Sequence, residues 1–235
     1  MTSGKWEKVQ LPDQSLTFFI DPMGFHFGQE AIEIINFIPD KHYSFALDLG
    51  CGDSVLALQL LNKKIAKKVC AIDLQTESCV RSRKNAVLNE LDSSLAIINA
   101  DVSHIKSFMR AHIFDLIVTN PPFFAIGNDF PETSNSETKS RQEIHGNLRV
   151  FLNAAAFLLK KNADLILLYH PRRLDYALRE LNLAGFTLKE LQLIHHQDGR
   201  ALFVFMRGVP GGKPGITVRP PKFLGKSLKH EVDKL

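Results

Sequence analysis

The chain has 235 residues, of which 45% are hydrophobic and 23% are charged, and its formal net charge is +4. This composition is typical of a soluble globular protein, and the mild basicity permits an acidic partner without requiring one. No apolar run approaches the roughly 20 residues that a membrane-spanning helix needs, so we expect no membrane association. The three cysteines lack metal-site spacing and are interpreted as reduced thiols of a cytoplasmic protein that holds no metal.

Residues 1–28 are predicted to be irregular apart from a short strand at Leu16–Ile20, and Glu30–Ile38 is predicted to form a short helix. Beyond Ser44, apolar strands alternate with amphipathic helices. The expected strands are Ser44–Leu49, Lys68–Asp73, Leu95–Asn99, Phe114–Thr119, Ala163–Tyr169, Thr187–His195 and Leu202–Arg207. The expected helices are Val55–Leu61, Thr76–Leu91, Asn147–Leu159 and Arg172–Leu183. In the second of these, the apolar side is expected to carry Val80, Ala86, Val87 and Leu91, and the other side Arg81, Arg83 and Lys84.

This alternation predicts an α/β fold with a doubly wound, mostly parallel, seven-stranded Rossmann-like sheet and an antiparallel strand near one edge. We divide the chain into an N-terminal segment (1–40), the main domain (41–207) and a basic C-terminal tail (208–235). The tail holds six lysines and arginines against two acids, so its net charge of +4 equals that of the whole chain. Such a tail is predicted either to contact phosphates or to be a solvated chain end.

Glycines and polar residues follow four of the predicted strands: Gly50 and Gly52, then Asp73, Asp101 and Asn120. Ligands of doubly wound sheets bind beyond the carboxyl ends of the strands, so these residues are expected to form one site. A carboxylate at Asp73 can accept hydrogen bonds from ribose hydroxyls, and Asp101 is placed to meet an adenine amine. The alternative for each acid is a helix N-cap or a solvated strand end.

The fourth strand ends abruptly at Asn120-Pro121-Pro122-Phe123. The two prolines remove backbone donors and stop the strand, and a residue before proline is held extended. The predicted result is a rigid shelf with a side-chain amide, free carbonyls and an exposed aromatic ring. The alternative is an ordinary turn that ends the strand, and Phe124 is interpreted as a core residue.

As a set, these residues resemble the Rossmann-like methyltransferases that use S-adenosylmethionine, over about Phe45 to Arg207. The resemblance implies S-adenosylmethionine as the cofactor, with Asp73 at its ribose and Asp101 at its adenine. The cofactor-binding residues that it implies are Gly28, Asp48, Gly50, Cys51, Gly52, Asp73, Leu74, Asp101, Val102 and Asn120.

An Asn-Pro-Pro-aromatic shelf is similar to the signature of methyltransferases that act on planar nitrogen. The lone pair of such an amine is delocalised and a poor nucleophile. The Asn120 side-chain oxygen and the Pro121 carbonyl can accept its two N–H bonds, and Phe123 can stack on a base with about 1–3 kcal/mol. The predicted catalytic residues are therefore Asn120, Pro121, Pro122 and Phe123.

The chain also resembles the bacterial family that methylates an adenine N6 atom beside the anticodon of a valine tRNA. This likeness rests on Gly24–Gly28, on Asn120–Phe124 followed by Arg141, and on Gly211–Lys213 with Ile216–Pro221. It implies an N-terminal segment that caps the cofactor site, and a monomer that acts on RNA, most simply tRNA. The implied RNA-binding residues are Phe123, Arg141, Lys213, Arg219 and Lys222.

Three alternatives to tRNA adenine methylation stay open: guanine N2 methylation of ribosomal RNA, methylation of a glutamine amide in a translation factor, and a non-catalytic binding module. The first two chemistries use a similar shelf. Two further features carry no prediction. His195-His196 has no third metal ligand at a suitable spacing, and Cys51 has no neighbouring base to make it a nucleophile.

Overall fold

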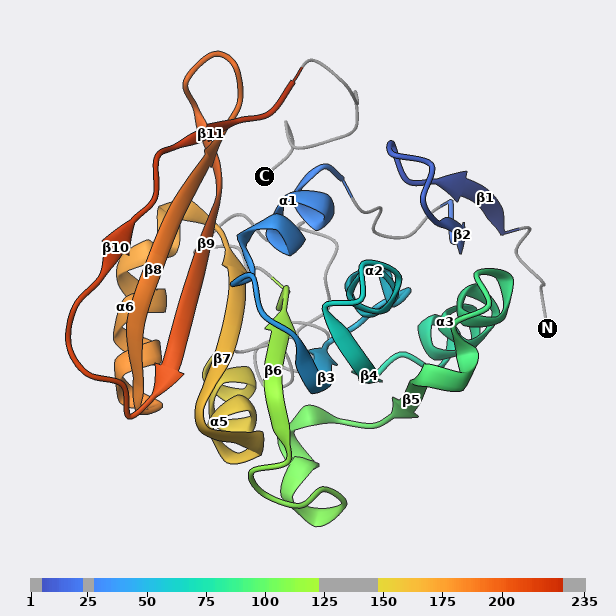
Figure 1. Cartoon of the computed structure of the whole chain (residues 1–235), viewed down its shortest axis with the longest axis horizontal. Coiled ribbons are helices and arrows are strands. Elements are labelled where there is room, and N and C mark those ends of the chain that lie inside the picture. The colour runs from blue at the N-terminus through green and yellow to red at the C-terminus, as the bar shows by residue number, and fades with distance from the viewer. Residues whose placement is uncertain (1–5, 23–27, 123–147, 226–235) are drawn as a thin grey trace, which may run out of the picture.

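The computed structural model describes residues 6–22, 28–122 and 148–225 (Figure 1). Phe123, Phe124, Arg141, residues 24–27 and the end of the tail lie outside these ranges. The centre of the described fold is a nine-stranded sheet with the strand order β10-β8-β9-β7-β6-β3-β4-β5, in which β11 also pairs with β8. The strands are β3 (Tyr43–Leu49), β4 (Ala66–Asp73), β5 (Leu95–Asn99), β6 (Phe114–Thr119), β7 (Leu159–Tyr169), β8 (Phe186–His195), β9 (Ala201–Pro210), β10 (Thr217–Val218) and β11 (Lys222–Phe223).

The predicted doubly wound topology is confirmed. Strands β5, β4, β3, β6 and β7 are mutually parallel, and β9 lies antiparallel between β7 and β8. The chain builds the sheet outward from β3 to β5 and then crosses back to place β6 on the other side of β3. The switch point therefore lies between β3 and β6, whose residues Leu47 and Ile117 are fully buried.

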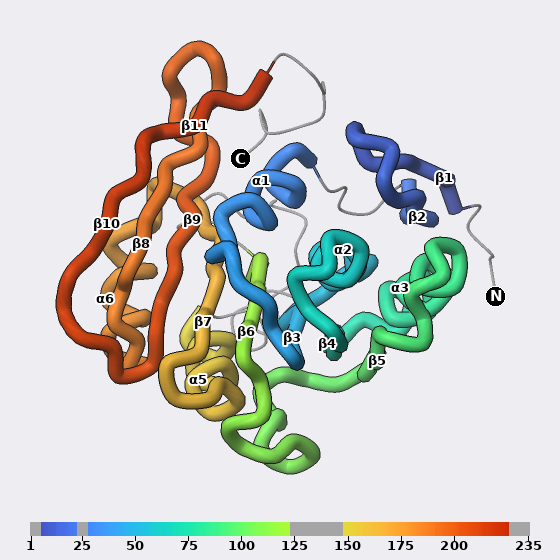
Figure 2. The backbone as a smooth tube through the Cα atoms, viewed as in Figure 1, coloured from blue at the N-terminus to red at the C-terminus, as the bar shows by residue number. Residues whose placement is uncertain are grey.

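Helices cover both faces of the sheet (Figure 2). One face carries α1 (Glu30–Phe37), α2 (Val55–Asn62) and α3 (Thr76–Leu88), and the other carries α5 (Leu148–Leu158), α6 (Leu174–Leu183) and the short helix η2 (Val102–Ser107). Successive strand residues point to opposite faces. Ala46 accordingly packs in the first layer, whereas Leu47 and Leu49 pack in the second. Short turns η1 (Asp92–Ser94) and η4 (Pro171–Arg173) complete these connections.

The predicted orientation of α3 is wrong in part. Ala86, expected on its apolar side, is buried, and Arg83 and Lys84, expected on its polar side, are exposed. Val80 and Val87, expected on its apolar side, are 40% and 63% exposed, whereas Arg81, expected on its polar side, is 8% exposed. The buried side of α3 is instead made of small and polar residues, among them Ser82 and Asn85. These residues face the glycine turn after β3 and the N-terminal strands, where backbone groups need hydrogen-bond partners.

Two N-terminal strands, β1 (Glu7–Gln10) and β2 (Thr17–Ile20), form an antiparallel hairpin, of which the sequence predicted only the second strand. Asn85 of α3 bonds both to the Phe19 amide, at 2.7 Å, and to the Phe19 carbonyl, at 3.2 Å. Asn89 does the same for Thr17, at 2.9 and 2.7 Å. The two side-chain amides thus bond to backbone groups of β2 as a neighbouring strand would, and they hold the hairpin against α3.

The first part of the predicted tail is ordered against the sheet. Strands β10 and β11 each pair in parallel with the edge strand β8, and Leu224 is buried. Arg219 lies over the Phe37 ring at 4.4 Å, and Lys222 forms an ion pair with Glu33, so the segment also contacts α1. Among the described residues, no helix is long and apolar enough to cross a membrane.

Candidate active site

The end of β6 carries the predicted shelf. The Thr119 hydroxyl donates to the Leu49 carbonyl at 2.7 Å, which joins the ends of β6 and β3 at the switch point. Asn120 follows and lines a large cavity, and its Oδ1 atom is buried without a hydrogen-bond partner in the described part of the chain. Pro121 is buried and Pro122 is exposed. An unpaired buried acceptor is unfavourable by about 1–3 kcal/mol, so Asn120 is suited to accept from a bound ligand.

The turn after β3 leaves backbone open to the same cavity. Gly50 and Gly52 have φ angles of +77° and +51°, which residues with a Cβ rarely adopt. The amides of Gly50 and Cys51 donate to the Ile72 carbonyl at 2.9 and 3.0 Å, so the turn is fixed against β4. A Cβ atom built on Gly52 would meet no atom within 4 Å. A ligand can therefore approach the backbone closely at Gly52.

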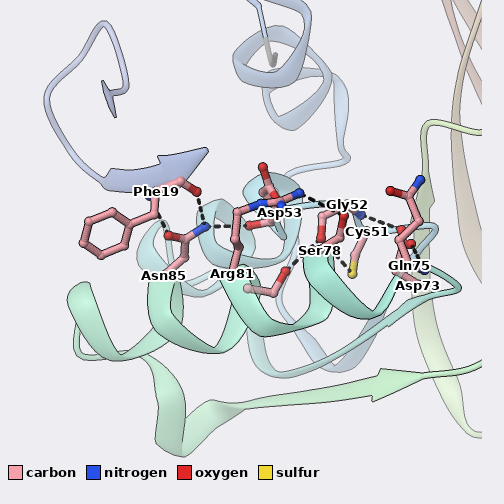
Figure 3. A network of polar contacts seen from close by, with 10 residues as sticks. Phe19, Cys51, Gly52, Asp53, Asp73, Gln75, Ser78, Arg81 and Asn85 are labelled. Carbon is pink, nitrogen blue, oxygen red and sulfur yellow. Dashed lines mark hydrogen bonds and ion pairs between the residues drawn. The ribbon is translucent and has the colours of Figure 1, made fainter. Parts of the chain in front are cut away.

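Asp73 holds this turn at the end of β4 (Figure 3). One carboxylate oxygen accepts from the Gly52 amide at 2.8 Å and the other accepts from the Gln75 amide at 2.8 Å. A carboxylate has about four acceptor positions, so these two bonds leave capacity for the hydroxyls of a ribose. The predicted role of Asp73 is compatible with this arrangement and stays a prediction.

Asp101 caps the short helix η2, as one of the two interpretations of the sequence expected. Its Oδ1 atom accepts from the Ser103 amide at 2.8 Å. Leu74 is 52% exposed and Val102 is buried. These residues lie with Asp73 at the carboxyl ends of β4 and β5, but outside the described lining of the large cavity. Their contact with an adenine ring also stays a prediction.

Two buried carboxylates line the cavity near Asn120. Asp48 on β3 is 1% exposed and accepts from the Ala57 amide at 3.0 Å. Burial, with a smaller contribution from the charge of Asp73, raises the pKa of Asp48 to about 7. Glu30 at the start of α1 is 8% exposed, and burial raises its pKa as well. The sequence did not single out Glu30, although Gly28, which was predicted, donates its amide to Glu30 Oε1 at 2.7 Å.

The cavity has a volume of about 920 Å³, which lies within the range of small-molecule sites. It extends from Asn120 and Leu168 past the glycine turn to the N-terminal hairpin. Its described lining is Trp6, Phe19, Asp21, Glu30, Ala31, Asp48, Gly50, Cys51, Gly52, Asp53, Val55, Leu56, Gln75, Glu77, Ser78, Arg81, Lys84, Asn120 and Leu168. The structure therefore brings Asp48, Gly50, Cys51, Gly52 and Asn120 to one cavity, whereas Asp73, Leu74, Asp101 and Val102 lie outside its described lining.

The outer part of the cavity contains residues that the sequence did not single out. Arg81 donates from Nε to Asp53 Oδ1 at 2.7 Å, and the two side chains are only 9% and 10% exposed (Figure 3). Lys84 lies 4.3 Å from the centre of the Trp6 ring. These pairs join segments that are far apart in the sequence, so no local pattern indicates them.

Two of the predicted RNA-binding cations have carboxylate partners. Arg219 donates to Glu190 at 2.5 Å, and Lys222 pairs with Glu33. Lys213 is exposed. The first two cations therefore hold the C-terminal segment to β8 and α1, whatever RNA contacts they make. Contact of all three with RNA stays a prediction.

The other reactive side chains have structural surroundings. Burial raises the pKa of the Cys51 thiol well above its usual value, which keeps the thiol neutral and unreactive. His195 Nδ1 lies 2.8 Å from the Gly199 carbonyl, and its ring lies 5.3 Å from that of Phe223. Within the described ranges, no three histidine, cysteine, aspartate or glutamate side chains come together as a metal site.

Known proteins share this sequence pattern and this fold. The family model of the methyltransferase small domain matches residues 32–156, which is more than half of the chain. A tRNA1(Val) (adenine(37)-N6)-methyltransferase of Klebsiella pneumoniae is 30% identical over 126 residues, covering 51% of each protein. A ribosomal RNA large subunit methyltransferase G of Shewanella amazonensis is 34% identical over 88 residues, covering 37% of the chain and 22% of the relative.

The fold also matches that of a predicted O-methyltransferase from Agrobacterium tumefaciens, with a TM-score of 0.66 and 16% identity over 82% of the chain and 86% of the solved one. The matched region spans about half the length of the Klebsiella relative. The family match itself covers β3 to β6, which carry the glycine turn, Asp73 and Asn120. The chain belongs to the methyltransferase small domain family.

Proposed function

We propose that the protein transfers a methyl group to the exocyclic amine of a nucleobase, namely adenine N6 in a tRNA. The observation that carries this proposal is the buried, unpaired Oδ1 atom of Asn120 at the cavity. An exocyclic amine has two N–H donors, and an acceptor that no described residue satisfies is suited to bind one of them. The relative from Klebsiella, which acts on an adenine of tRNA by its name, supports the choice of base.

The residues of the shelf act by positioning the amine. Asn120 Oδ1 and the Pro121 carbonyl accept hydrogen bonds from the two N–H groups of the amine. These bonds favour a more tetrahedral nitrogen, whose lone pair can be directed at the reacting carbon. Pro122 keeps the shelf rigid, and Phe123, outside the described residues, is proposed to stack on the base. When bound, S-adenosylmethionine would supply an activated methyl group: the bond from the methyl carbon to sulfur breaks as the bond to nitrogen forms. The thioether S-adenosylhomocysteine leaves, and the methylated amine releases one proton to solvent. The task of the chain is therefore to orient the amine.

The residues at the carboxyl edge fit a bound S-adenosylmethionine. The open backbone at Gly52 and the undersatisfied Asp48 suit its methionine part, together with Gly50, Cys51 and Gly28. Asp73 keeps acceptor capacity for the ribose hydroxyls, beside Leu74. Asp101 and Val102 are proposed to border the adenine ring, because the loop after β5 lies next to the loop after β4.

The RNA is proposed to run outside the cavity. The described lining holds five carboxylates (Asp21, Glu30, Asp48, Asp53, Glu77) and two cations, Arg81 and Lys84. An excess of acids disfavours phosphates, so only the target base is expected to reach Asn120. The exposed Lys213, with Arg141, is the better candidate for phosphate contact than Arg219 or Lys222, which hold the C-terminal segment.

Guanine N2 methylation of ribosomal RNA is the second candidate, because one relative is by its name a ribosomal RNA methyltransferase. The two candidates are separated by incubating the purified protein with labelled S-adenosylmethionine and either tRNA or ribosomal RNA that lacks methylation. Mass spectrometry of the nucleosides should detect N6-methyladenosine in tRNA. N2-methylguanosine in ribosomal RNA would instead support the second candidate.

The shelf is tested in the same assay with Asn120→Ala. Loss of one positioned acceptor should lower the rate by at least about 100-fold while S-adenosylmethionine still binds. The matched control is Asn36→Ala, which removes an exposed amide of α1 that bonds only to Glu33 within the described chain. Normal methyl transfer by Asn120→Ala would rule out the proposed shelf chemistry.

A further inference from the structure

Glu30 occupies an unusual position for a carboxylate. It is the first residue of α1, it is 8% exposed, and it lines the cavity together with Asp48 and Asn120. The Gly28 amide donates to Glu30 Oε1 at 2.7 Å, whereas no described residue donates to Oε2. Glu30 is therefore a largely buried acid of the cavity lining, and its Oε2 atom accepts no hydrogen bond from a described residue.

Buried carboxylates in proteins are almost always paired with a cation, because transfer of an isolated charge out of water is strongly unfavourable. No cation of the described chain fills this role for Glu30. Arg81 pairs with Asp53, and Lys84 lies over the Trp6 ring. Glu33, one turn further along the same helix, shows the usual solution, since it pairs with Lys222.

The missing partner is best supplied by a cationic ligand in the cavity. S-adenosylmethionine carries two cationic groups, the sulfonium and the α-ammonium of its methionine part. The sulfonium has no N–H bond, whereas an ammonium has three donors and can satisfy a free carboxylate oxygen. Asp48 lies on the same part of the lining and adds negative charge there.

We infer that Glu30 binds the α-ammonium group of the methyl donor through its Oε2 atom. This inference rests on the assignment of the cavity to S-adenosylmethionine and is independent of which nucleobase is methylated. It gives α1 a specific role, namely to present an acid to the amino-acid end of the cofactor. The C-terminal segment packs against the outer side of the same helix through Arg219 and Lys222.

Glu30→Gln tests the inference by calorimetric binding of two cofactor fragments. S-adenosylhomocysteine retains the α-ammonium, whereas 5′-methylthioadenosine lacks the amino-acid group altogether. Because a hydrogen bond to a charged group is lost, the variant should bind S-adenosylhomocysteine about 10- to 100-fold more weakly. Its affinity for 5′-methylthioadenosine should stay within about twofold of the parent protein.

The matched control is Glu90→Gln, which removes the same charge from an exposed position outside the described lining of the cavity. It should leave the affinities for both compounds within about threefold, since exposed charges interact weakly with a ligand. Equal weakening of both compounds by Glu30→Gln would overturn the inference and assign Glu30 to the packing of α1. Unchanged binding of both compounds would overturn it too. If the parent protein bound neither compound, the assignment of the cavity to S-adenosylmethionine would fail, and the inference would fail with it. The nucleoside assay tests the proposed methyl transfer separately, because it measures the methylated base and not the binding of these compounds.

Discussion

A buried aspartate lies near each end of the parallel strands, and the two differ in the number of their hydrogen-bond and ion-pair partners. Asp48 on β3 and Asp164 on β7 are both 1% exposed. Asp164, near the amino-terminal end of the parallel strands, accepts from the Tyr43 hydroxyl at 2.8 Å and Arg207 at 2.9 Å, and it pairs with Lys41 at 2.6 Å. Asp48, at the carboxyl end, accepts only the Ala57 amide among its described neighbours.

We interpret Asp164 as a stabilising acid and propose Asp48 as a binding acid. Asp164 is surrounded by donors and cations that compensate its burial, and Arg207 extends the network to Glu190 and from there to Arg219. Asp48 has no cationic partner among the described residues, and burial raises its pKa to about 7. A buried carboxylate with too few hydrogen-bond donors lowers the stability of the ligand-free protein. We therefore propose that a bound ligand supplies the missing partner of Asp48 at the cavity.

The largest effect is expected from Asp164→Ala. The substitution leaves the buried Tyr43 hydroxyl without its acceptor and removes one of the two carboxylate partners of Arg207. Breaking one side of a buried pair typically lowers the free energy of unfolding by about 3–5 kcal/mol. Urea denaturation followed by circular dichroism measures this loss. Asp40→Ala, at an exposed position, is the control and should change stability by less than about 0.5 kcal/mol. Equal effects of the two variants would show that the Asp164 network contributes little.

Asp48→Asn should act in the opposite sense on the free protein. Asparagine can still accept the Ala57 amide but carries no charge, so the free energy of unfolding at neutral pH should stay equal or rise. The same variant should bind S-adenosylmethionine at least about tenfold more weakly, because a negative charge beside a cationic ligand is lost. Calorimetry and urea denaturation test both parts. A variant that is both less stable and normal in binding would place Asp48 with Asp164.

The carboxyl edge of the sheet could be predicted because its signals are local. A buried strand followed by Gly50 and Gly52, or by the two prolines after Asn120, indicates an element end without knowledge of the rest of the chain. Doubly wound topology then brings such ends together. The family resemblance added a prediction of which part of the cofactor each of these residues contacts.

Other parts of the site depend on contacts between distant segments. Arg81 looked like a solvated cation because its partner Asp53 lies 28 residues away in the sequence. Arg219 and Lys222 looked like free cations because their partners, Glu190 and Glu33, lie on β8 and α1. Glu30 was missed because a single acid at the start of a helix usually faces water.

The pH dependence of stability has a definite sign. The pKa of Asp48 is about 7 in the folded protein and near its ordinary value of 3.8 in the unfolded chain. Between these values the unfolded chain releases a proton that the folded protein keeps. The contribution of Asp48 to the free energy of unfolding therefore falls as the pH rises from about 4 to about 7. Urea denaturation across this range should show a weaker fall for Asp48→Asn than for the parent protein.

Tyr43→Phe should have the smallest effect and sharpens the contrast between the two aspartates. The substitution removes one donor from Asp164 but leaves Arg207 and Lys41 in place, so the expected loss is about 1 kcal/mol in urea denaturation. Burial and the charge of Asp164 raise the pKa of Tyr43, which keeps its hydroxyl protonated as a donor. A loss as large as that of Asp164→Ala would mean that the two cations cannot hold Asp164 alone. The neutral Tyr43 hydroxyl would then be the main partner that compensates the burial of Asp164. The difference between Asp164 and Asp48 would lie in this hydroxyl and not in the number of cations around each carboxylate.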